Sequence, residues 1–154
     1  MYPVFDGLLC VSIAVESLEN ATADYQERLG LVPMGPVYES QRGYALRWRN
    51  FGNGDTVMLE LLEATSPTSP VARFLREHGE GVYQVRLATG DLLGTATALK
   101  ERGSRVIGAD DPEQTPELCW IHPASTHGVL IELVQTGFTG NPSDHRENRG
   151  GTRR

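Results

Sequence analysis

Residues 126–135, THGVLIELVQ, are apolar almost throughout and contain one acid, Glu132. A second stretch, TVMLELLEA at residues 56–64, places Glu60 in a similar setting, followed by leucine and surrounded by apolar residues. An ionised carboxylate in such a strand costs several kcal/mol unless another group pairs with it. Because the pattern occurs twice, the sequence indicates an internal repeat, and this repeat decides how the fold is interpreted.

The segments upstream of the two acidic strands support the repeat. They read VSIAVESLENATADYQERLG at residues 11–30 and VRLATGDLLGTATALKERGS at residues 85–104. Each begins with alternating apolar residues, passes through a polar turn and continues with the spacing of an amphipathic helix. Ser17 and Asp91 have the position and chemistry of helix N-caps.

Each half therefore predicts a strand, a helix and three further strands, a βαβββ module in an α+β fold. The Asn53-Gly54 pair predicts a hairpin between the last two strands of the first module. The expected strands lie near 8–15, 33–38, 43–50 and 56–63 in the first module, and near 82–88, 104–108, 116–122 and 128–135 in the second.

Between the modules, SPVARFLREHG predicts a short helix that Ser69 caps, with Pro70 in its first turn and Gly79 at its end. The last residues have almost no apolar content, which is typical of a disordered tail. The predicted organisation is an N-terminal arm (1–7), the first module (8–65), a linker helix (66–81), the second module (82–135) and the tail (136–154).

Composition excludes several classes of function. The 154 residues are 39% hydrophobic and 22% charged, and the formal net charge is −6 with no basic stripe outside the extreme C-terminus, so nucleic-acid binding is not expected. No apolar run has membrane-spanning length, and no signal peptide is recognised at the start of the chain. Two cysteines make no disulfide framework, which predicts a cytoplasmic location.

Three blocks carry a resemblance to a known family: VSIAVESLENATADYQERLGL, TVMLELLEATSPTSPVARFLREHGEGV and WIHPASTHGVLIELVQ. They resemble the methylmalonyl-CoA epimerase branch of the vicinal oxygen chelate superfamily, which includes glyoxalases, bleomycin-resistance proteins and dioxygenases. The likeness covers roughly residues 8–135. It implies two tandem βαβββ modules that form a curled mixed sheet around a cleft, a homodimer, and a divalent metal held by four inward positions.

Carried onto this chain, those four positions are Cys10, Glu60, Gln84 and Glu132. The family usually has histidine at the first and third, and both imidazoles are absent here. Carboxylate and amide oxygens suit magnesium, calcium or manganese, whereas a thiolate is a soft ligand, so the set matches no common metal site well. A divalent metal and a site without cofactor both stay open.

Without a metal, the resemblance implies that Glu60 and Glu132 face each other in the cleft. Two close carboxylates cannot both ionise cheaply, so such a pair supplies one acid and one base. The alternative is that one of them merely bonds Gln84, Tyr83 or a backbone amide. The aromatic residues Tyr83, Tyr44 and Trp48 either line the cleft or fill the core.

Two functions follow, each with a small molecule as partner and no membrane or nucleic acid. The first is an isomerase, epimerase or lyase that moves a proton next to the carbonyl group of an acyl-CoA thioester or a related small molecule. In it Glu60 or Glu132 is the base, and Gln84 with Tyr83 donates hydrogen bonds to the enolate oxygen. The second is a metal-free binding or sequestering protein of the bleomycin-resistance type.

Overall fold

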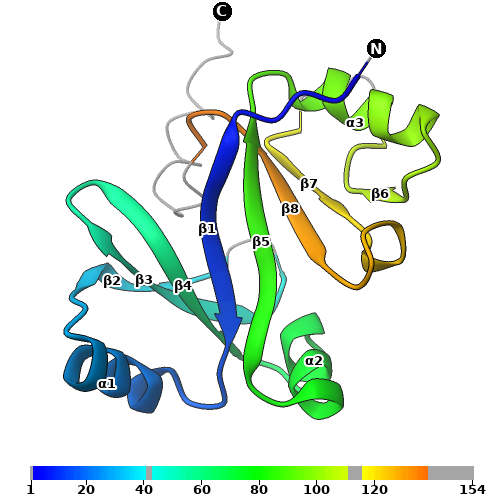
Figure 1. The fold of residues 1–154 in the computed structure, drawn as a ribbon. Coiled ribbons are helices and arrows are strands. Elements are labelled where there is room, and N and C mark those ends of the chain that lie inside the picture. Colours follow the sequence, from blue (N-terminus) through cyan, green and yellow to red (C-terminus); the bar gives the residue numbers. More distant parts are fainter. Residues whose placement is uncertain (1, 41–42, 111–115, 139–154) are drawn as a thin grey trace, which may run out of the picture. The chain divides into compact units, whose positions relative to one another are not determined.

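A computed structural model describes residues 2–40, 43–110 and 116–138, and the chain divides into two compact units. Of the described residues, unit 1 comprises 2–12, 83–110 and 116–138, and unit 2 comprises 13–40 and 43–82. From residue 139 onward, the predicted disordered tail lies outside the described residues. Figure 1 shows the elements, in chain order β1 (Gly7–Ala14), α1 (Leu18–Leu29), β2 (Pro33–Glu39), β3 (Leu46–Asn53), β4 (Thr56–Ala64), α2 (Pro70–His78), β5 (Gly81–Thr89), α3 (Leu92–Glu101), β6 (Val106–Ile107), β7 (Leu118–Ile121), a 3-10 turn (Pro123–Ser125) and β8 (Leu130–Gln135).

This order confirms the strand, helix and three strands expected in each half of the chain, and α2 lies between the two sets. The predicted domain boundaries and the linker role of α2 stay predictions. Ser69 caps α2 by accepting a hydrogen bond from the amide of Ala72, at 3.0 Å. Among the described residues, no helix is long and apolar enough to cross a membrane.

In unit 2, β2, β3 and β4 form an antiparallel ladder, in which β3 lies between the other two. The predicted hairpin joins β3 to β4, and Gly54 in its turn has a positive φ of 59°, which glycine adopts without strain. Helix α1 covers one face of this ladder, where Leu18 packs in a buried cluster with Phe51 and Leu61.

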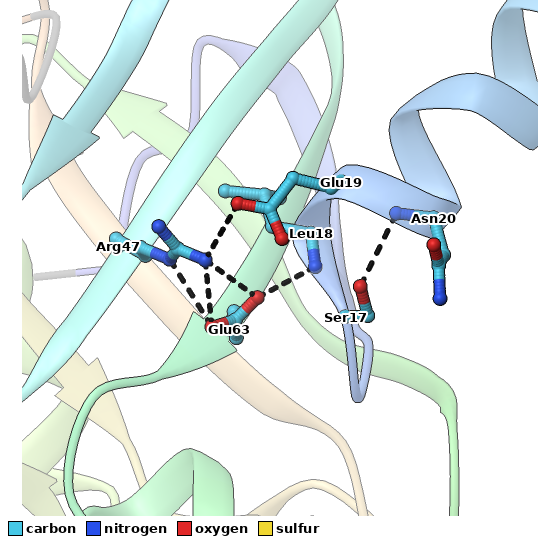
Figure 2. A network of polar contacts seen from close by, with 6 residues as sticks. All are labelled: Ser17, Leu18, Glu19, Asn20, Arg47 and Glu63. Atoms are coloured by element: carbon cyan, nitrogen blue, oxygen red, sulfur yellow. Dashed lines mark hydrogen bonds and ion pairs between the residues drawn. The ribbon is translucent and has the colours of Figure 1, made fainter.

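The start of α1 is fastened to this ladder by a polar network (Figure 2). Ser17 accepts a hydrogen bond from the amide of Asn20 at 3.2 Å, as the predicted N-cap should. Glu63 on β4 accepts a second one from the amide of Leu18 at 2.6 Å. The Arg47 guanidinium on β3 lies 3.0 Å from Glu63 and 3.2 Å from Glu19, so the network joins the helix to both strands.

Unit 1 contains a mixed sheet, because β5 pairs with β8 in parallel whereas β7 pairs with β8 and β6 in antiparallel fashion. Asp91 caps α3 through the amide of Gly94 at 2.9 Å. The apolar face of α3 packs on one face of the sheet, in a buried cluster whose members include Leu92, Ala96, Leu99, Cys119, Ile121 and Leu133.

The alternation of side chains decides which residues of unit 1 face away from α3. Leu133 on β8 and Leu87 on β5 pack toward α3. Residues with even numbers on these two strands therefore point to the opposite face, because successive side chains of a strand alternate. Gln84, Arg86 and Glu132 share this second face.

Candidate functional site

The parallel pairing of β5 with β8 builds a polar cluster in unit 1. The register sets Gln84 opposite Leu130 and Arg86 opposite Glu132. Since neighbouring strands lie about 4.8 Å apart, side chains in register on one face come within contact distance. A guanidinium, an amide and a carboxylate are thereby collected on the face that α3 leaves uncovered.

The contacts in this cluster are close and shielded from water. Arg86 donates from Nε to Glu132 Oε1 over 2.6 Å, and the two side chains are only 12% and 8% exposed. Gln84 donates from Nε2 to the other carboxylate oxygen, Oε2, over 3.0 Å. The same Nε2 lies 3.4 Å from the hydroxyl of Ser12, which is fully buried on β1. Both oxygens of Glu132 therefore accept hydrogen bonds.

This cluster explains why Glu132 stands in an apolar strand. A buried carboxylate is tolerated when a cation and hydrogen-bond donors compensate its charge. Gln84 is one of the alternative hydrogen-bond partners that the sequence analysis named for the two glutamates. Arg86, the ionic partner, was missed, although it lies two positions after Gln84 in the mostly apolar stretch VYQVRLAT and therefore belongs on the same strand face.

The charge of Glu132 also acts on neighbouring groups. Burial raises the pKa of the Tyr83 phenol, and the Glu132 carboxylate raises it further, so Tyr83 keeps its proton. Burial raises the pKa of the Cys119 thiol to about 11, with Lys100 acting in the opposite sense and Glu132 in the same sense. The remaining predicted residue of unit 1, Cys10, is buried on β1.

The other predicted site residues belong to unit 2. Glu60 on β4 is buried and in register with Asn50 on β3. The buried Oδ1 atom of Asn50 has no hydrogen-bond partner among the described residues. Trp48 is buried and stacks on Tyr38 with ring centroids 5.7 Å apart, while Tyr44 is half-buried. The facing of Glu60 and Glu132, and their acid and base roles, stay predictions.

A divalent metal does not fit the unit 1 cluster in the arrangement observed. The groups that contact the carboxylate are N–H donors, one of them cationic, whereas a metal ion needs lone pairs from oxygen, sulfur or imidazole. Within the described ranges, no group of three or more histidine, cysteine, aspartate or glutamate side chains is placed to hold a metal. The metal-ligand roles of Cys10, Glu60, Gln84 and Glu132 stay predictions.

Unit 2 also contains an open hollow of about 410 Å³. It lies beside α2 and the end of β4, and none of the predicted site residues lines it. Its walls are formed by Val15, Glu16, Glu63, Ala64, Thr65, Ser66, Pro67, Ala72, Leu75 and Arg76.

Comparison with known proteins supports the fold and also shows the family to which the chain belongs. The model of the Glyoxalase/Bleomycin resistance protein/Dioxygenase superfamily matches residues 11–120. The ethylmalonyl-CoA/methylmalonyl-CoA epimerase of Cereibacter sphaeroides is 32% identical over 129 residues, which are 81% of this chain and 94% of that protein. The mitochondrial methylmalonyl-CoA epimerase of Bos taurus is 30% identical over 128 residues, which are 81% of this chain and 71% of that protein.

A solved structure shows the same similarity. A variant of Streptomyces coelicolor methylmalonyl-CoA epimerase, in complex with 2-nitronate-propionyl-CoA, superposes with a TM-score of 0.75. It is 26% identical, and the match covers 88% of this chain and all of that one. The chain belongs to the glyoxalase/bleomycin resistance/dioxygenase superfamily and has the vicinal oxygen chelate fold. The resemblance drawn from the sequence is thereby confirmed.

Proposed function

We propose that this protein catalyses proton transfer next to the carbonyl group of an acyl-CoA thioester, as an epimerase or isomerase. The curated relatives reported above are named as acyl-CoA epimerases, and the Streptomyces coelicolor structure contains an acyl-CoA analogue. The observation that carries the proposal is the buried cluster of Gln84, Arg86 and Glu132, which combines a carboxylate with hydrogen-bond donors in one place.

The donors of the cluster suit the charge that this reaction develops. Removal of the proton next to a thioester carbonyl leaves an enolate, whose negative charge gathers on the carbonyl oxygen. Fixed N–H donors in a dry site stabilise such an oxyanion by a few kcal/mol each. We assign this role to the amide of Gln84, which lies in the cluster. Tyr83 keeps its proton because its pKa is raised, but strand alternation turns it to the face that packs on α3, so its role as a second donor stays a prediction.

The carboxylate of Glu132 suits the role of proton acceptor. A carboxylate has roughly four lone-pair positions, so the two contacts with Arg86 and Gln84 leave room for a proton on either oxygen. The same contacts hold the carboxylate in one orientation, and a fixed orientation is a large part of what a catalytic base contributes. Glu60 in unit 2 stays the second candidate base.

The test is exchange of the proton next to the carbonyl in deuterated water. Methylmalonyl-CoA, ethylmalonyl-CoA and propionyl-CoA are incubated with the protein, and deuterium uptake is followed by NMR and mass spectrometry. We expect uptake with the wild-type protein and a roughly 10²- to 10⁴-fold slower rate with Glu132→Gln, because a positioned base contributes about that factor.

The matched control is Glu63→Gln, which removes a carboxylate that binds Arg47 and the start of α1 rather than the cluster. We expect this variant to keep the wild-type exchange rate. An active Glu132→Gln variant would remove Glu132 from the mechanism. Absence of exchange with all three thioesters would contradict the proposed reaction.

A second candidate function is metal-free binding of a small molecule. It is favoured by the commitment of Glu132 to an ion pair, since a carboxylate in that state also serves as a purely structural group. Calorimetric binding of an acyl-CoA thioester without any deuterium uptake would select this function. The homodimer and the cytoplasmic location stay predictions, which gel filtration with light scattering and cell fractionation test.

A further inference from the structure

The charge of Glu132 has to be compensated within the protein. Its side chain is 8% exposed, so water contributes little to its solvation. A buried carboxylate persists when it is paired with a cation, supplied with N–H donors or bound to a metal ion. If a cation or N–H donors of the protein already compensate this charge, the site does not need a metal ion.

Arg86 supplies a cation from the sheet itself. The parallel register of β5 and β8 sets it opposite Glu132, and its Nε lies 2.6 Å from the carboxylate. An arginine side chain is in effect never deprotonated in proteins, so this positive charge is permanent. It is also fixed in place, since the Arg86 side chain is only 12% exposed.

Gln84 completes a set of groups suited to an anion. Its amide nitrogen, rather than its oxygen, lies toward Glu132 Oε2 and the Ser12 hydroxyl. An amide nitrogen donates hydrogen bonds and offers no lone pair to a metal. A divalent ion placed here would meet N–H groups and a guanidinium, which repels it strongly at short range in a low-dielectric site.

We propose that Arg86 is the built-in cation of this site and that it keeps divalent metal ions away from Glu132. The guanidinium compensates the charge that a metal ion would otherwise compensate, and a metal bound to the carboxylate would lie next to this fixed positive charge. The inference goes beyond the acyl-CoA reaction and does not depend on it, because it concerns the charges of the resting protein.

The first test uses the wild-type protein. Metal-free protein is titrated with Co²⁺ and with Mn²⁺, bound metal is measured after dialysis, and thermal unfolding is recorded with and without EDTA. We expect no stoichiometric uptake and a midpoint that neither metal nor EDTA shifts. One equivalent of bound metal that the Glu132→Gln variant fails to bind would overturn the proposal.

The second test separates the missing imidazoles from the added cation. Cys10→His/Gln84→His places histidine at both positions but keeps Arg86, whereas a third change, Arg86→Ala, removes the cation as well. We expect the triple variant to bind Co²⁺ roughly tenfold more tightly or better, read from the visible absorption of the bound ion. Equal affinity in the double and triple variants would contradict the proposal.

Two further variants serve as matched controls for the second test. Arg86→Lys in the double-histidine background keeps a positive charge and should bind Co²⁺ as weakly as the double variant. Arg73→Ala in the same background removes an exposed arginine of α2 and should leave the affinity unchanged. Circular dichroism confirms that each variant is folded, and the wild-type titration stands whether or not the triple variant folds.

Discussion

Two arginine–glutamate pairs, one in each unit, join neighbouring strands but differ in how deeply they are buried and in what they stabilise. Arg86 and Glu132 in unit 1 are 12% and 8% exposed, whereas Arg47 and Glu63 in unit 2 are 31% and 18% exposed (Figure 2). The first pair compensates a charge that water hardly reaches. The second keeps some hydration and fastens a helix to a sheet. The same two residue types therefore serve a buried site in one unit and the architecture in the other.

The buried pair offers the largest effect. Arg86→Met leaves the Glu132 carboxylate buried without its cation, and loss of one partner of a buried pair costs about 3–5 kcal/mol. Replacing both residues, as Arg86→Met/Glu132→Leu, removes the charge as well as its partner and should recover most of the lost stability. Urea unfolding of the three proteins measures both differences. An Arg86→Met variant as stable as the wild type would show that the Glu132 carboxylate does not depend on the Arg86 cation.

The next largest effect is a loss of stability at alkaline pH, when the Cys119 thiol ionises. Burial raises the pKa of the fully buried Cys119 thiol to about 11 from its ordinary value of 9.0, so folding favours the neutral thiol. Its contribution of about 2–3 kcal/mol is present below pH 9 and is lost as the pH rises through about 11. Stability measured by urea unfolding should fall over that range, and Cys119→Ala should fall less steeply. Parallel slopes would contradict the raised pKa.

Glu63→Gln tests the partly exposed pair of Arg47 and Glu63 and should cost less, about 1–2 kcal/mol. The change removes the charge that Arg47 contacts and weakens the acceptor of the Leu18 amide at the start of α1. Partial exposure reduces the loss, because water solvates both charges. Thermal unfolding gives the value, and added salt should narrow the gap to the wild type. A loss as large as that of Arg86→Met would erase the contrast between the two pairs.

An exposed pair gives the lower end of the same scale. Arg73 and Glu77 lie one turn apart on α2, are 74% and 54% exposed, and approach to 3.1 Å. Arg73→Met should therefore cost only about 0.3–0.5 kcal/mol, as is typical of exposed helix pairs. Urea unfolding at low salt is the measurement. A cost above that of Glu63→Gln would show that burial does not order these three pairs.

The two acidic strands show which features the two halves of the repeat share and which they do not. Glu60 and Glu132 occupy matching places in β4 and β8, as expected from the sequence. Their neighbours in register differ, since Glu60 lies opposite the amide of Asn50 whereas Glu132 lies opposite Arg86 and Trp120. The offset that pairs Cys10 with Gln84 also pairs Ser12 with Arg86, so only the second module contains the cation at that place.

The sequence by itself determined the repeat, the order of strands and helices, the caps at Ser17 and Asp91, and the hairpin at Asn53-Gly54. These features depend on periodicity and on contacts between residues close in the chain, which a single sequence displays. The tertiary structure alone decided that Arg86 is the partner of Glu132, 46 positions away. A contact of that kind exists only once β5 and β8 are set side by side in one register, because shifting a strand by one residue would turn its side chains to the opposite face.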